Sequence, residues 1–146
     1  MRGGHRLLEH TADLCLLAHG PSEEALFEAA GCGLLAVMGE SASPGGRRRV
    51  GLTARDREGL LVAWLNEIIY LAAAEGGPPA ACGVDVVRHD GGSCLEGWVG
   101  APAPWRQGGA EVKAATYHGL TVRPPSAAAP PGVPRGSWWA EIVLDI

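Results

Sequence analysis

The chain has 146 residues, of which 47% are hydrophobic and 19% are charged, and its formal net charge at pH 7 is -4. This length and composition are typical of one globular domain, spanning residues 1–146, and exclude a disordered chain. The acidic balance argues against direct nucleic-acid binding, because free-standing nucleic-acid-binding domains usually carry a clustered basic surface. No stretch approaches the roughly 18 uncharged apolar residues that a membrane-spanning helix needs. We therefore expect a soluble, cytoplasmic protein without a membrane partner.

The first half of the chain predicts strands alternating with helices. The run LCLLAH at residues 14–19 has the length and apolar character of a strand, and RRRVGLTA at residues 47–54 predicts a second, exposed strand. A helix should span residues 22–39, because a serine cap and two glutamates precede apolar residues at helical spacing. A second helix, capped by an aspartate, should span residues 56–76 and be covered on much of its circumference.

The second half has the alternating pattern of strands. Residues 84–90 and 93–100 flank an Asp-Gly-Gly turn and predict a hairpin. Residues 110–123 predict one long strand, or two strands broken at a glycine, and residues 137–146 predict the closing strand. The Pro/Ala-rich segment 124–136 looks too poor in large apolar residues to pack. The whole order predicts an α+β fold, with two helices packed on a largely antiparallel sheet.

Four cysteines occur at positions 15, 32, 82 and 94, and none belongs to a C-x-x-C pair. We interpret them as reduced thiols of a cytosolic protein, with no zinc-finger spacing to a histidine. The densest basic run, Arg47-Arg48-Arg49, is more readily explained as a solvated strand entrance than as a contact surface.

Two carboxylates stand out as candidate site residues, because the sequence lacks a P-loop, a G-x-S-x-G motif and an H-E-x-x-H motif. Asp13 precedes the first apolar strand, and Asp145 ends the last one. If these strands are neighbours, both carboxylates and the terminal oxygens of Ile146 would lie together and would suit a hard divalent cation. The simpler alternative, that Asp13 caps a turn and Asp145 faces solvent, is the more frequent outcome for such residues.

Several polar residues are candidates for supporting the metal ligands or for contacting a partner protein. His10 and Thr11 stand beside the first carboxylate, where turn formation is the commoner role. Alternation in the long strand would put Lys113 and Tyr117 on one face and His118 on the other, where a histidine could support metal ligands.

Three further positions leave alternatives open. Asn66 and Glu67 interrupt the apolar second helix, where they mark either its solvent edge or a polar pocket. Trp138 and Trp139 are adjacent in the closing strand, so one should face inward and the other outward, as a candidate interface anchor.

Taken together, these segments resemble the archease family. The matching stretches occur in family order and spread over nearly the whole chain: HTAD at 10–13, SEEALFEAA at 22–30, LLVAWLNEIIYL at 60–71, EVKAATYHGL at 111–120 and VLDI at 143–146.

The resemblance implies an α+β sandwich and a non-enzymatic role as an accessory factor of the RtcB-type RNA ligase of tRNA splicing and RNA repair. In that family the factor promotes guanylylation of the ligase and multiple turnover. The resemblance also implies a divalent cation, calcium with magnesium or manganese as alternatives, held by Asp13, Asp145 and Ile146. Two other functions remain open from the residues, a metal-dependent hydrolase with His10 or His118 as base, and a general chaperone for nucleic-acid enzymes.

Overall fold

The computed structural model describes residues 3–8, 13–39, 46–105 and 111–146. Its strands are β1 (Gly4–Leu8), β2 (Leu14–Gly20), β3 (Arg48–Ala54), β4 (Cys82–His89), β5 (Ser93–Val99), β6 (Ala114–Arg123) and β7 (Trp138–Asp145), and its helices are α1 (Glu23–Met38) and α2 (Arg57–Glu75). The strands form two sheets, of order β1-β2-β7-β6 and β3-β5-β4, in which every pairing is antiparallel. The predicted α+β class with two helices is confirmed.

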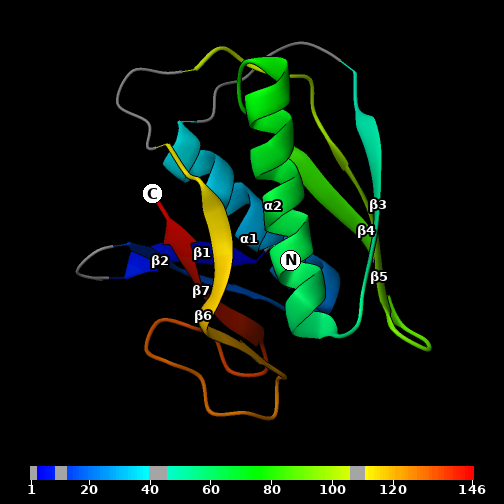
Figure 1. Cartoon of the computed structure of the whole chain (residues 1–146). Coiled ribbons are helices and arrows are strands. Elements are labelled where there is room, and N and C mark those ends of the chain that lie inside the picture. The colour runs from blue at the N-terminus through cyan, green and yellow to red at the C-terminus, as the bar shows by residue number, and fades with distance from the viewer. Residues whose placement is uncertain (1–2, 9–12, 40–45, 106–110) are drawn as a thin grey trace.

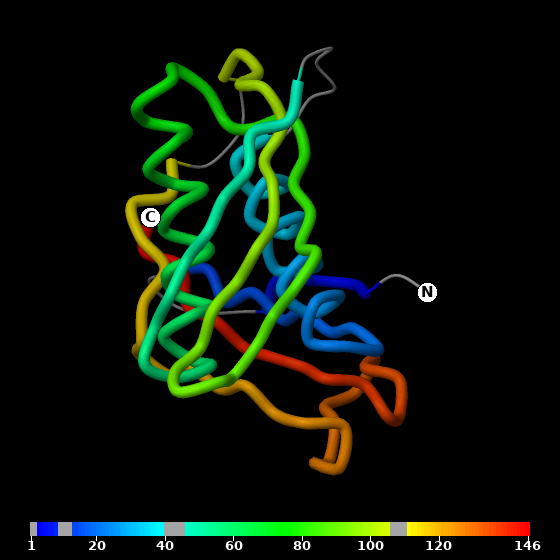
Figure 2. The backbone as a smooth tube through the Cα atoms, turned by 90° about the vertical axis from the view of Figure 1, so that its right-hand side faces the viewer, coloured from blue at the N-terminus to red at the C-terminus, as the bar shows by residue number. Residues whose placement is uncertain are grey.

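The two helices lie between the two sheets (Figure 1). Helix α1 packs on β1 and β2 of the four-stranded sheet and on β4 of the other, whereas α2 packs on β6 of the first sheet and on β3 and β5 of the second. Seen from the side of the three-stranded sheet, β3, β5 and β4 run next to one another in front of the helices (Figure 2). Because each helix has neighbours on opposite sides, residues on opposite faces of each helix are buried, as Leu26 and Leu35 of α1 and Leu60 and Val62 of α2 show.

The ends of both helices follow from local chemistry. The Ser22 hydroxyl accepts a hydrogen bond from the Ala25 amide at 3.1 Å, and the Asp56 carboxylate accepts one from the Gly59 amide at 2.7 Å. Each helix stops at a glycine in the left-handed region, where a side chain would be strained, and the second of these is Gly76 at φ 78°. The caps predicted from the sequence are confirmed. In the described part of the chain, neither helix has the length and apolar content required to cross a bilayer.

Two features depart from the sequence prediction. Strand β1 was not predicted, and it pairs with β2 from Gly4 opposite His19 to Leu8 opposite Cys15. The segment 124–136 was expected not to pack, and this is wrong, because Val133 is buried and the Arg6 guanidinium donates to the carbonyl of Pro131. The segment is held to β1, so it belongs to the folded body.

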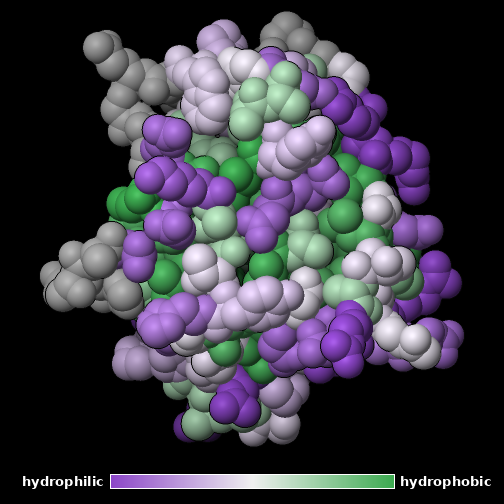
Figure 3. All heavy atoms as spheres, viewed as in Figure 1, coloured by the Kyte–Doolittle hydropathy of each residue, from purple (hydrophilic) through white to green (hydrophobic). Residues whose placement is uncertain are grey.

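The arginine run lies where β3 begins, and all three side chains are exposed, as expected of a solvated strand entrance. Arg48 pairs with Glu75, and the Arg47 guanidinium stacks at 3.8 Å from the ring centroid of Trp98. Hydrophilic residues dominate the edge of the molecule where the three-stranded sheet lies (Figure 3). Two of the three arginines therefore have contacts within the fold.

Helix side chains bond to one edge strand of each sheet, β6 in the four-stranded sheet and β4 in the three-stranded sheet. The Asn66 side chain of α2 accepts a hydrogen bond from the Ala115 amide at 2.8 Å and donates one to the Ala115 carbonyl at 3.3 Å, so it acts as a short substitute strand beside β6. On α1, Glu28 accepts from the Val84 amide of β4 at 3.1 Å. Asn66 is half-buried and bonds to an edge strand, a role that neither of the two alternatives from the sequence included.

We predict that Asn66→Ala lowers the free energy of unfolding by about 2–3 kcal/mol, because it leaves two backbone groups of Ala115 without their partner. Urea unfolding monitored by circular dichroism would measure this. Glu67→Ala, at the next half-buried position of α2, is the matched control and should cost clearly less. Equal losses for the two variants would contradict the edge-pairing role.

Candidate functional site

The two candidate carboxylates lie at the same end of neighbouring strands. Strands β2 and β7 pair with Leu14 opposite Leu144. Asp13 and Asp145 each stand one residue beyond this pair, at the same end of these two central strands. The first apolar strand and the last strand are therefore neighbours, which is the condition that the sequence set for a shared carboxylate site. It brings together residues from opposite ends of the sequence.

Strand β6 fixes Asp145 from its other side. Ala114 is its register partner, and the Lys113 amide donates a 2.7 Å hydrogen bond to the Asp145 carbonyl. Leu144 is fully buried against the helices, so strand alternation turns the carboxylate of Asp145 to the outer face of the sheet. Both Asp145 and Ile146 are exposed.

The carboxylate oxygens of Asp13 and Asp145 are donors that a hard divalent cation prefers. Side chains at opposed positions of an antiparallel pair have Cβ atoms about 4.5–5.5 Å apart, and two carboxylates at that separation repel unless a cation lies between them. Within the described ranges, no group of three or more His, Cys, Asp or Glu side chains is placed to hold a metal. Asp13 and Asp145 would therefore need a further oxygen donor, for which the backbone of Ile146 is the adjacent source.

The remaining predicted site residues are placed differently. His10 and Thr11 lie outside the described residues. Tyr117 and His118 are exposed and lie where the β6–β7 register shifts, between Thr116 and Thr121. Tyr117 faces the start of α2, since a Cβ at Gly59 would lie 3.4 Å from its hydroxyl.

A set of contacts that was not predicted joins five elements, α1, α2, β4, β5 and β7. Glu23, in the first turn of α1, accepts hydrogen bonds from Arg57 of α2 at 2.9 and 3.2 Å, and one of its oxygens lies 2.6 Å from Nε2 of His89. Nδ1 of that histidine lies 2.7 Å from the Ser93 hydroxyl, and Arg57 stacks on Trp138 of β7 at 4.9 Å. A helix-capping pattern predicts acidic residues here, but nothing in the sequence indicates their partners.

The Ser93–His89–Glu23 chain resembles a catalytic triad only in composition. Ser93 is only 4% exposed, so a substrate does not reach its hydroxyl. Burial alone would raise the pKa of Glu23, but hydrogen bonds from Arg57 and His89, with their charges, hold that pKa below its ordinary value. These contacts therefore form a structural junction between the β4–β5 hairpin, both helices and β7.

We predict that Glu23→Gln lowers the free energy of unfolding by about 2 kcal/mol at neutral pH, because a charged, part-buried hydrogen-bond acceptor is lost. A carboxylate whose pKa is depressed by folding stabilises the protein above the unfolded pKa and loses this effect as pH falls through the folded one. The deficit should stay constant down to pH 4.5, the ordinary pKa of a glutamate, and shrink below it. Urea unfolding across this range measures the deficit.

Glu96→Gln is the control, because Glu96 forms an exposed pair with Arg88 at 3.8 Å, and it should show little effect on the free energy of unfolding at any pH. A Glu23→Gln deficit that persists in acid would contradict the assignment.

The chain resembles known proteins over nearly its whole length. Residues 5–146 match the model of the Archease protein family (MTH1598/TM1083). The protein archease of Methanosarcina mazei is 30% identical, over 97% of this chain and 95% of its own. The solution structure of protein 1598 of Methanobacterium thermoautotrophicum has a TM-score of 0.74 at 26% identity, covering 98% of this chain and 99% of its own. The crystal structure of a Thermotoga maritima archease, described as a possible chaperone, shares the fold with a TM-score of 0.57 at 23% identity, covering 95% of this chain and 94% of its own.

Proposed function

Because this chain belongs to the archease family, we propose that it is a non-enzymatic accessory factor that activates an RtcB-type RNA ligase. It promotes guanylylation of the ligase and multiple turnover, and it acts through a divalent-cation site at Asp13, Asp145 and a backbone oxygen of Ile146. The observation that supports this proposal most directly is the β2–β7 register, in which Asp13 and Asp145 lie at the same end of these two strands.

The site's location suits contact with another macromolecule. Asp145 and Ile146 are exposed at the sheet edge and project from a rigid support, since Leu144 beneath them is fully buried. The Lys113 amide holds the Asp145 backbone in place. A divalent cation, of which calcium is our first expectation, supplies positive charge that neutralises the carboxylates and attracts the phosphates of a nucleotide.

A general chaperone role is the second candidate, favoured by the description of the T. maritima structure as a possible chaperone. Such a role would depend on exposed apolar surface and not on Asp13 and Asp145. Suppression of aggregation of unrelated enzymes, retained when both carboxylates are neutralised, would support it.

We predict that Asp13→Asn and Asp145→Asn each lower stimulation of the ligase roughly tenfold or more, the range seen when the surroundings of a metal site are disturbed. The assay follows covalent ligase–GMP formation from GTP, with the ligase of the same organism, with and without calcium, magnesium or manganese. Both residues lie at or near the surface, so the free energy of unfolding should change by about 0.5 kcal/mol or less.

Asp85→Asn is the matched control, because Asp85 is an exposed aspartate on β4 of the other sheet. It should stimulate like the unmodified protein. Equal stimulation by all three variants would contradict the proposed site. Hydrolysis of phosphoesters by the purified protein alone would contradict the non-enzymatic role.

A further inference from the structure

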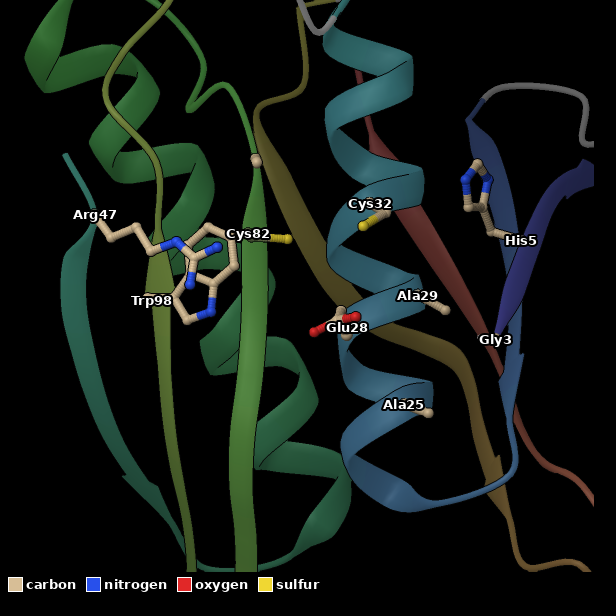
Figure 4. A pocket seen from close by; sticks show the side chains of 10 residues that line it. Gly3, His5, Ala25, Glu28, Ala29, Cys32, Arg47, Cys82 and Trp98 are labelled. Atoms are coloured by element: carbon tan, nitrogen blue, oxygen red, sulfur yellow. The ribbon is translucent and has the colours of Figure 1, made fainter. Parts of the chain in front are cut away.

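A trough of about 500 Å³ crosses the outer side of α1, between β1 of one sheet and β4 of the other (Figure 4). Its floor is low because α1 presents small residues there, Ala25 and Ala29. His5 of β1 stands at one side, and the stacked Arg47 and Trp98 stand at the other. It lies apart from the carboxylate end of the sheet, since none of its lining residues belongs to β6 or β7.

Two cysteines from distant parts of the sequence line this trough. Cys32 belongs to α1 and Cys82 to β4, and their thiols point toward one another across the gap between helix and strand (Figure 4). Gly31 makes this approach possible, because a Cβ at that position would lie 2.7 Å from Cys82 Sγ. A glycine inside a helix costs about 1 kcal/mol relative to alanine, so close packing of the Cys82 thiol is a physical reason for its presence.

The two thiols differ in access. Cys32 is half-buried and borders the trough, whereas Cys82 is 6% exposed. The Arg47 guanidinium, whose positive charge favours a thiolate, lines the same trough, and so does Glu28, one turn before Cys32, whose negative charge opposes one. An oxidant entering the trough therefore meets Cys32 first, with Cys82 behind it.

We propose that Cys32 and Cys82 form a dithiol modification site that a disulfide oxidant converts into a disulfide between α1 and β4. The Cys32 thiolate attacks one sulfur of glutathione disulfide and releases one glutathione thiolate. The Cys82 thiolate then attacks the Cys32 sulfur of the mixed disulfide and releases the second. The protein loses two electrons and two protons, and one glutathione disulfide becomes two glutathione molecules.

The new bond would reinforce contacts that already hold β4 to α1. Glu28 and Glu24 of α1 accept hydrogen bonds from the Val84 and Val87 amides of this edge strand. A disulfide that closes the long chain segment between the helix and the strand stabilises the folded state mainly by restricting the unfolded chain. The oxidised protein should therefore have a higher urea midpoint than the reduced protein.

The other two cysteines provide an internal control. Cys15 is buried on β2 of the four-stranded sheet, and Cys94 is on β5 of the three-stranded sheet, with the helices between them. Burial and the nearby charge of Glu141 raise the pKa of Cys15, which lowers its reactivity further. No disulfide between these two is expected.

The experiment treats the folded full-length Cys15→Ser/Cys94→Ser protein with glutathione disulfide and follows its intact mass and its non-reducing peptide map. The expected product is lighter by two hydrogen atoms, contains a Cys32–Cys82 peptide, unfolds at higher urea and reverts with dithiothreitol. The Cys32→Ser/Cys82→Ser protein should form no intramolecular disulfide. Adding Cys82→Ser alone should stop the reaction at a glutathione adduct on Cys32.

Stable glutathione adducts on both thiols of the folded protein would overturn the proposal, as would a folded protein that does not react although the urea-unfolded protein does. Gly31→Ala gives a second readout, because its methyl group displaces the Cys82 thiol and should slow closure at least severalfold. An unchanged closure rate in that variant would contradict the assigned geometry.

Discussion

The antiparallel pairing of β2 with β7 is the constraint on which the rest of this molecule depends. It forms the middle of the four-stranded sheet, and Leu16 and Ile142, opposite each other in its register, are fully buried beneath the helices. A slip of one residue would turn every side chain of one strand to the other face, so the apolar inner face fixes the register. The same register sets Asp13 beside Asp145. The hydrophobic core thus determines where the residues of the proposed cation site lie.

The helices serve a second purpose besides filling the space between the sheets. Edge strands expose unpaired backbone groups that invite aggregation. Here Asn66 of α2 pairs with β6, and glutamates of α1 pair with β4, so polar side chains on largely apolar helices complete the sheets. The junction of Glu23, Arg57 and His89 joins the helix starts to the hairpin. Polar residues on these helices are therefore structural links, a role that helical periodicity alone does not indicate.

The sequence predicts the elements whose signals are local. Both helices, their caps at Ser22 and Asp56, and the hairpin around the Asp-Gly-Gly turn follow from propensity and spacing within a few residues. The adjacency of the first apolar strand and the last strand was only a condition for a shared site of Asp13, which precedes the one, and Asp145, which ends the other. The predictions of helices, caps and hairpin succeed because each depends on neighbouring residues or on a simple pattern.

The remaining features depend on contacts between distant segments. Strand β1, with the sequence GHRLL, is short and lacks a clear alternation, and it is a strand only because β2 offers it an edge. Val133 is one apolar residue in a Pro/Ala-rich segment, and it is buried although its sequence neighbours offer no apolar pattern. The facing of Cys32 and Cys82 likewise requires the packing of α1 on β4. Sequence patterns carry no signal for such pairings.

The central claim is that the end of the β2–β7 pair binds a divalent cation. Titrating calcium into the ¹⁵N-labelled protein and recording backbone amide shifts tests it directly. The amides of Leu14, Lys113 and Asp145 should shift together with one dissociation constant, while those of the β3-β5-β4 sheet stay unchanged. Amides at this end that do not respond to millimolar calcium, magnesium or manganese, or a response confined to another part of the molecule, would contradict the account.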